Sequence, residues 1–294
     1  MNNEFDVIIP VGVKDVMLVT TNVVHINKNI KPQKIYLITS LDNINKLKTK
    51  KLPDNVVLLN EDEICKDITY EKVDKLVKNK YGKSYSGGWF FQQFLKISFA
   101  QTKYAKTYYL AWDADTIPIN KITFFAEDKI LINPKKEYNK SYFIMIKKLL
   151  NIDRQVDYSF ISEHLMINTS IMNEMIQKIS SRLDGEPSIY DRILSFLQKD
   201  NFNCFSEYET YGNYMALYHP NKFKLRELRT FRTCAKFYGR NLNKEDDIKD
   251  LRLDFDSISL ELRDMKKSPI LYIRLNYYCI KLMQFFRKLN VIIC

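Results

Sequence analysis

Two acidic residues with the spacing of a cation site stand near the middle of the chain. Asp113 and Asp115 directly follow the apolar run 108–112, and Pro118 comes soon after them. The run predicts a buried strand, and in an open α/β sheet ligands bind beyond the carboxyl ends of the strands. Two carboxylates there could hold Mg²⁺ or Mn²⁺, which would neutralise a substrate diphosphate and improve it as a leaving group. The alternative is an ordinary turn, where aspartate is common.

The elements that would position these acids follow a regular order in the first half of the chain. Short apolar runs predict strands, and the segments between them have the length of helices. Such alternation indicates a parallel sheet covered on both faces, where strands are apolar throughout. The predicted strands are 5–11, 34–39, 56–59 and 108–112, and the predicted helices are 16–29, 64–80 and 89–102.

The second half of the chain is less regular. A strand or buried segment is predicted within 157–167, and helical spacing of apolar residues predicts helices at 170–182 and 189–199. The chain after about residue 236 is charged and is expected to be helical.

Five segments in this order resemble GT-A type nucleotide-sugar glycosyltransferases, and in particular a group of bacterial surface-polysaccharide (capsule and lipopolysaccharide) transferases. The resemblance covers about residues 5–220. It implies a Rossmann-like, mostly parallel α/β sheet flanked by helices, with a C-terminal helical extension. The matching segments are 5–11, 87–96, the strand with Asp113 and Asp115, 163–168 and 206–213.

The resemblance also assigns residues to the nucleotide-sugar donor. Val11, Gly12 and Lys14 would lie against the base and ribose, with Lys14 near phosphate. Gln92, Gln93 and Lys96 include pairs three and four residues apart, so part of this polar set can share one helix face. That face would line the donor pocket, with Lys96 near the diphosphate. The alternatives are an ordinary strand-to-helix loop and a surface lysine.

Two glycines and two histidines also receive roles. The paired glycines 87 and 88 permit close backbone approach or a turn before a helix, and the resemblance assigns the histidines. His164 would line a pocket near the donor or acceptor sugar, although a hydrogen-bonded core histidine is the alternative. His219 would complete the metal site with Asp113 and Asp115.

The segment 206–213 mixes carboxylates, aromatic rings and a glycine, as sugar recognition requires. An inverting transfer needs a carboxylate to take the proton from the acceptor hydroxyl, and Glu209 or Glu207 is the candidate, with Glu209 favoured. In a strand their spacing would place them on opposite faces, so that only one of them would be the base. The alternative is an exposed acidic loop.

Composition bounds the setting of the protein. The 294 residues carry a net charge of +11, and the five cysteines form no CxxC pair, which favours reduced thiols in a cytoplasmic protein. Neither a signal peptide nor a transmembrane segment is predicted. From Met265 onward there are six basic residues and no acidic ones, and basic residues recur every seven positions among aromatic and aliphatic residues: Lys267, Arg274, Lys281 and Lys288.

This tail predicts a helix lying in a membrane interface, or a terminal helix packed on the protein body. Nucleic-acid binding is disfavoured, because no nucleic-acid motif accompanies the charge.

Together these features predict a GT-A domain at 1–235, with a nucleotide-binding half (1–120) and an acceptor-binding half (121–235), and a basic amphipathic extension at 236–294. The expected activity is hexosyl or related transfer, aided by Mn²⁺ or Mg²⁺, from a nucleotide-diphosphate sugar (a UDP-sugar first) to a glycan or lipid-linked acceptor at the inner face of the membrane. The alternatives are a nucleotidyltransferase acting on sugar phosphates, although a Gly-rich loop after the first strand is missing, and a non-catalytic membrane-associated binding module.

Overall fold

The computed structural model describes residues 4–197, 201–240, 242, 245–266, 275 and 277–283. Contacts divide the chain into two compact units. The first comprises Met1–Val16, Pro32–Ala114 and Thr123–Glu227, and the second comprises Met17–Lys31, Asp115–Ile122 and Leu228–Cys294. The second unit thus includes two segments from the N-terminal half of the chain. The predicted domains, divided at residue 235, follow the sequence without such exchanged segments.

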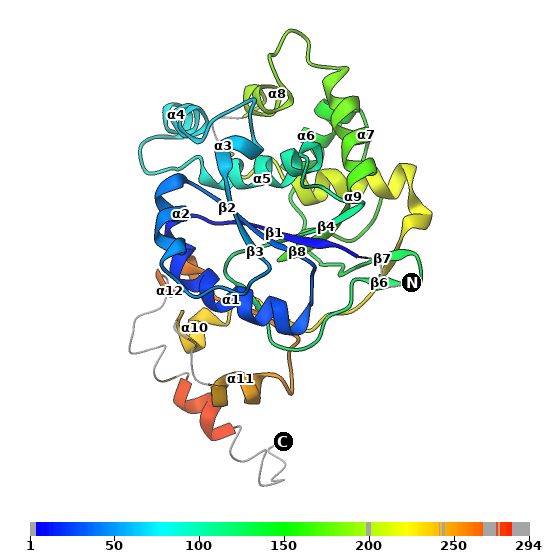
Figure 1. The fold of residues 1–294 in the computed structure, drawn as a ribbon. Helices are drawn as coiled ribbons and strands as arrows, with labels where there is room; N and C mark the ends of the chain where they lie inside the picture. Colours follow the sequence, from blue (N-terminus) through cyan, green and yellow to red (C-terminus); the bar gives the residue numbers. More distant parts are fainter. Residues whose placement is uncertain are drawn as a thin grey trace. The chain divides into compact units, whose positions relative to one another are not determined.

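The first unit is built on a five-stranded sheet with the order β3-β2-β1-β4-β8 (Figure 1). The first four strands are parallel, and β8 runs antiparallel to β4. The predicted α/β class with a mostly parallel sheet is therefore confirmed. The strands are β1 (Asp6–Pro10), β2 (Ile35–Thr39), β3 (Val56–Asn60), β4 (Tyr108–Trp112) and β8 (His164–Asn168).

Helices flank this sheet, and Figure 1 shows α5, α6, α7 and α9 on one face of it. Several begin at a polar N-cap; for example, the Asn168 side chain accepts a hydrogen bond from Ile171 N at the start of α7. The helices are α2 (Leu41–Lys48), α3 (Glu61–Ile64), α4 (Tyr70–Tyr81), α5 (Gly88–Ser98), α6 (Lys140–Leu150), α7 (Thr169–Ser180), α8 (Ile189–Ser195) and α9 (Glu207–Tyr218).

Shorter elements complete the first unit. A small sheet has the order β6-β7-β9, with β6 (Phe125–Ala126), β7 (Lys129–Ile132) and β9 (Phe223–Leu225). Single 3-10 turns lie at Val13–Asp15, Phe99–Gln101 and Pro220–Lys222.

The segment 206–213 forms the N-cap and the first half of α9, so the strand geometry considered for Glu207 and Glu209 does not apply. Ser206 caps the helix, and its Oγ accepts a hydrogen bond from Glu209 N at 3.2 Å. Serine followed three positions later by glutamate is the pattern that begins many helices. The helix is buried from Glu207 to Met215, so it lacks the apolar stripe that reveals a surface helix.

The second unit has a sheet with the order β10-β11-β5, in which β11 pairs antiparallel with β5. Asn29, the last residue of α1, donates a hydrogen bond from Nδ2 to Pro118 O at 2.7 Å. The C-terminal part contains the expected helices and an unexpected strand, β11. The elements are α1 (Val16–Asn29), β5 (Thr116–Pro118), β10 (Thr230–Phe231), α10 (Ala235–Tyr238), α11 (Glu245–Leu251), β11 (Ser257–Ser259) and α12 (Leu262–Lys266).

Most of the predicted basic stripe falls outside the described residues, namely Lys267, Arg274 and Lys288. Lys281 is described within the helical residues 277–283, and its Nζ lies 3.4 Å from Asp250 Oδ2. Within the described part of the chain, no helix has the length and apolarity needed to cross a bilayer.

Candidate functional site

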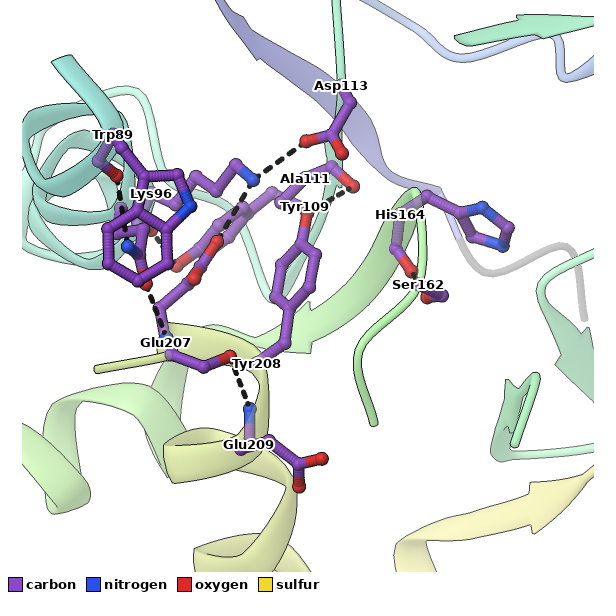
Figure 2. Close-up of polar contacts among 12 residues, drawn as sticks. Trp89, Lys96, Tyr109, Ala111, Asp113, Ser162, His164, Glu207, Tyr208 and Glu209 are labelled. Atoms are coloured by element: carbon purple, nitrogen blue, oxygen red, sulfur yellow. Dashed lines mark hydrogen bonds and ion pairs between the residues drawn. The ribbon is translucent and has the colours of Figure 1, made fainter. Parts of the chain in front are cut away.

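Lys96 occupies the centre of a buried charge cluster in the first unit (Figure 2). Its side chain is 2% exposed, and Nζ lies 2.9 Å from Asp113 Oδ1 and 2.9 Å from Glu207 Oε1. The ammonium also lies 4.4 Å from the centroid of the Tyr208 ring. Asp113 follows β4, Lys96 belongs to α5, and Glu207 begins α9, so the cluster joins three distant parts of the sequence at the carboxyl edge of the sheet.

The charges of this cluster support one another. Burial alone would lower the pKa of Lys96, but the attraction of Asp113 and Glu207 raises that pKa well above its usual value. Burial raises the pKa of Tyr208, so its hydroxyl stays neutral. Two acidic side chains thus face one ammonium in this cluster.

A hydrogen-bond framework fixes the position of Lys96. Tyr109 donates from its hydroxyl to Lys96 O at 2.8 Å. Gln93, one turn earlier on α5, donates from Nε2 to Trp89 O at 2.9 Å and accepts a hydrogen bond from Glu207 N at 3.0 Å through Oε1. Gln93 therefore connects α5 to the start of α9.

A glycine sets the entry of α5. An added Cβ at Gly87 would lie 2.6 Å from Asp74 N and 2.7 Å from Asp74 Cα, both rigid backbone atoms. The Asp74 carboxylate accepts a hydrogen bond from Gly87 N at 2.9 Å. The expectation of close backbone approach is therefore confirmed at Gly87, and it places α5, with Lys96, against α4.

Asp113 is the open side of the cluster, because its side chain is 33% exposed whereas Lys96 and the Glu207 side chain are buried. Its carboxylate is a hard oxygen ligand of the kind that Mg²⁺ and Mn²⁺ prefer. Among the described residues there is no group of three or more His, Cys, Asp or Glu side chains that could hold a metal ion. A cation at Asp113 fits the common Mg²⁺ arrangement of one or two carboxylates completed by substrate phosphate and water.

Asp115 opens the middle segment of the second unit, and its backbone carbonyl accepts a hydrogen bond from Leu260 N at 2.8 Å. Its role as a second cation ligand stays a prediction.

The segment before β8 borders the same sheet edge, because Asp113 N donates to Glu163 O at 3.0 Å. His164 is 4% exposed, and its ring stacks on that of Trp112 with centroids 4.8 Å apart. Burial lowers the pKa of His164 well below its usual value, so the ring is neutral at pH 7. This environment agrees with a core histidine, and its predicted pocket role stays a prediction.

The two candidate bases have different surroundings. Glu209 is 1% exposed and points away from Lys96 in Figure 2. Its Oε1 accepts a hydrogen bond from Ser159 Oγ, and its Oε2 accepts one from Asn213 Nδ2 at 3.1 Å. Burial raises the pKa of Glu209. Glu207 instead shares Lys96 with Asp113, so the structure joins Glu207, and not Glu209, directly to the cluster.

The predicted donor residues beyond β1 lie at the same carboxyl edge. Val11 is buried, donates from N to Ile38 O at 2.9 Å and accepts a hydrogen bond from Thr39 Oγ1 at 2.6 Å. Gly12 and Lys14 are exposed. Their contact with a nucleotide stays a prediction.

Two further predicted residues are not joined to the cluster by any contact in the described part of the chain. Gln92 is half-buried, and its neighbour Gln93 makes the bond to α9. His219 follows the C-terminal end of α9, about 18 Å along the helix from Glu207 at 1.5 Å per residue. Its Nε2 lies 2.7 Å from Glu174 Oε2.

Sequence reasoning placed Gln93 in one polar set with Gln92 and Lys96, because residues three and four positions apart can share a helix face. It did not single out Tyr208 or Tyr109, which lie in aromatic-rich segments that offer no distinguishing pattern.

The fold and the site define an α/β protein with a buried lysine held between two acids at the carboxyl edge of a mostly parallel sheet. The chain belongs to DUF6492, a family of unknown function, whose model matches residues 13–239. No curated protein matches the chain.

Solved structures similar to this chain include mouse xyloside xylosyltransferase 1 in its apo form, at 12% identity over 91% of this chain and 99% of that one, with a TM-score of 0.47. They also include the galactosyltransferase LgtC with donor and acceptor sugar analogs, at 9% identity over 87% of this chain and 86% of that one, with a TM-score of 0.43. An active-site mutant of LgtC covers the same shares at 9% identity, with a TM-score of 0.46.

Proposed function

We propose that this protein is a glycosyltransferase that moves a sugar from a nucleotide-diphosphate sugar, a UDP-sugar first, to a glycan or glycolipid acceptor in surface-polysaccharide biosynthesis. The observation that carries the proposal is the buried Lys96 between Asp113 and Glu207. It lies at the carboxyl edge of the parallel strands, where ligands of open α/β sheets bind.

Such a cluster is costly to maintain. Three buried or half-buried charges lose hydration, and apolar residues of similar volume often give equal or greater stability. Strongly perturbed charges beside a sheet edge are therefore candidates for function rather than for stability. In the proposed function the Asp113 carboxylate would bind a divalent cation, and the Lys96 ammonium would face the diphosphate.

A nucleotide-diphosphate sugar requires positive charge at its diphosphate. In the proposal Asp113, with Asp115 as the predicted second ligand, holds Mn²⁺ or Mg²⁺, which would neutralise charge on the leaving diphosphate. Lys96, 2.9 Å from the same Asp113 carboxylate, offers a second positive charge on that side. Preorganised charges of this kind stabilise a developing anion because they need no rearrangement during the reaction.

The acceptor hydroxyl requires a base if the transfer inverts configuration. Glu209 has the raised pKa that suits a general base, but its oxygens accept hydrogen bonds from Ser159 and Asn213. Glu207 lies at the cluster itself. Inversion through one of these glutamates is part of the proposal, and the anomeric configuration of the product tests it.

The test is release of nucleoside diphosphate from a panel of nucleotide sugars by the full chain with Mn²⁺. We expect one donor to be hydrolysed, and Asp113→Asn to lower the rate by about 10²–10³-fold, the usual loss for one preorganised electrostatic group. The matched control is Asp153→Asn, because Asp153 pairs with Lys147 at 2.8 Å but is 79% exposed. Release of pyrophosphate would indicate nucleotidyl transfer instead, and no turnover of any donor would contradict the proposal.

A further inference from the structure

Four aromatic side chains form a continuous surface beside the charge cluster, here called the aromatic platform: Tyr81, Tyr85, Trp89 and Phe202. Phe202 lies at its centre, with ring centroids 5.3 Å from Tyr81, 4.9 Å from Tyr85 and 5.5 Å from Trp89. The rings come from the end of α4, the loop before α5, the first turn of α5 and the loop before α9. All of them belong to the first unit.

The platform differs from the aromatic core of the same unit in its exposure. Tyr85 is 41% exposed, and the other three rings are half-buried. Phe90, by contrast, is completely buried, and its ring packs against those of both Trp89 and Phe202 from the interior side. The platform therefore presents apolar ring surface to solvent on a fixed base.

Two loop contacts hold the platform in place. The Tyr81 hydroxyl donates to Asn201 O at 3.1 Å, and Asn139 Nδ2 donates to Asn203 O at 2.9 Å. The bonds fix the backbone on both sides of Phe202. A prearranged surface loses less entropy when it binds a ligand.

The platform is connected to the charge cluster through one helix. Trp89 and Lys96 are seven residues apart on α5, which places them on one face about 10 Å apart along the axis. In Figure 2 both side chains project from α5. Gln93 lies between them and bonds both Trp89 O and Glu207 N.

We propose that the aromatic platform binds sugar rings of the acceptor glycan. A pyranose has C–H faces that pack on aromatic rings and hydroxyls at its edge that need polar partners, and half-exposed tyrosine and tryptophan offer both properties. The distance of about two helical turns to Lys96 suits an oligosaccharide whose terminal sugar reaches the cluster. This inference rests on the proposed function, because it names the acceptor side of the same site.

The test is binding of the fluorescently labelled full chain to a printed array of oligosaccharides. We expect the wild type to bind at least one glycan, Tyr85→Ala to weaken that binding at least tenfold, and Tyr85→Phe to retain it, because phenylalanine keeps the ring. The matched control is Tyr218→Ala, which removes a tyrosine that is 48% exposed at the far end of α9 and should leave binding unchanged.

Tryptophan emission gives a second measurement. The chain has two tryptophans, and Trp112 directly precedes Asp113, so a change on titration with the bound oligosaccharide that is lost in Trp89→Phe would report Trp89. Circular dichroism of each variant checks that the fold is retained.

Each outcome bears on the platform. A wild type that binds no glycan would overturn it, and so would equal effects of Tyr85→Ala and Tyr218→Ala or a Tyr85→Ala variant that binds normally. Nucleotide-sugar hydrolysis by the wild type separates the two proposals: hydrolysis without glycan binding overturns the platform alone, whereas absence of hydrolysis contradicts the proposed function.

Discussion

Replacement of Lys96 by methionine tests whether the buried charge cluster exists as described. Lys96→Met keeps a long unbranched side chain but removes the ammonium that lies 2.9 Å from both Asp113 and Glu207. Removing one partner of a buried ion pair costs about 3–5 kcal/mol, because an uncompensated charge remains. We take the lower end, about 3 kcal/mol, because Asp113 is 33% exposed and can regain water when the ammonium is lost. The remaining cost comes from the Glu207 side chain, which is only 6% exposed and stays buried without a partner cation.

The assay is urea unfolding followed by tryptophan fluorescence, which reports the first unit because Trp89 and Trp112 both belong to it. With a slope of about 3 kcal/mol/M, a loss of about 3 kcal/mol lowers the midpoint by about 1 M. The matched control is Lys147→Met. Lys147 lies 2.8 Å from Asp153, but the two side chains are 47% and 79% exposed, so its loss should cost no more than about 1 kcal/mol.

The pH dependence supplies a second criterion. In wild type the pKa of Lys96 is raised in the folded state. Its contribution to the free energy of unfolding is therefore fully present below the unfolded lysine pKa and is lost only as pH rises through the folded pKa. Lys96→Met lacks this titrating group, so its loss of stability relative to wild type should stay constant from pH 5 to pH 8, below the unfolded lysine pKa. Equal midpoints for the Lys96 and Lys147 variants at pH 8 would refute the buried cluster.

Two other predictions concern packing and a buried acid. Gly212→Ala should lower the free energy of unfolding by about 1–3 kcal/mol, because the added Cβ would lie 2.1 Å from Phe160 Cγ. Gly88→Ala is the control and should leave the free energy of unfolding unchanged, because the nearest contact of its Cβ would be at 3.5 Å. Equal urea midpoints for the two variants would contradict this packing. Burial raises the pKa of Glu163, although Lys135 opposes this, so wild type should lose stability as pH rises through that folded value. Glu163→Gln should therefore unfold at higher urea than wild type at pH 8, with a smaller difference at pH 5, and parallel pH profiles would exclude the effect.

β1, β2 and β4 could be predicted from the sequence because nearly all of their residues are buried. Residues buried on both faces of a sheet are mostly apolar, so these strands stand out as apolar runs. α1 was predicted with its observed bounds. The same local patterns could not show that α1 joins β5 and β11 in the second unit, because β5 and β11 are about 140 residues apart in the sequence and their pairing is non-local.

The start of α9 could not be identified from periodicity. Its residues from Glu207 to Met215 are buried on all sides, polar ones included, so no apolar face repeats at the helical interval. The capping pattern of Ser206 and Glu209 was the available signal, and it would have placed the two glutamates in the first turn of a helix.

The sequence also left Lys96 between two interpretations, a surface lysine and a residue near a diphosphate. The structure excludes the surface lysine, because Lys96 is 2% exposed. Its burial depends on Glu207, which lies more than a hundred residues later in the chain, so no local pattern could have revealed it. The contact with a diphosphate stays a proposal.

The cluster itself argues for function over stability. Mutual attraction among Asp113, Lys96 and Glu207 offsets their lost hydration, but a packed apolar trio would avoid that loss altogether. The framework from Tyr109 and Gln93 adds hydrogen bonds whose effect is to hold the ammonium in one place. Precise placement of a buried cation contributes little to folding, whereas it has a direct use beside an anionic ligand, because a prearranged charge acts at full strength where water is excluded. The open Asp113 carboxylate is the side from which such a ligand would reach it.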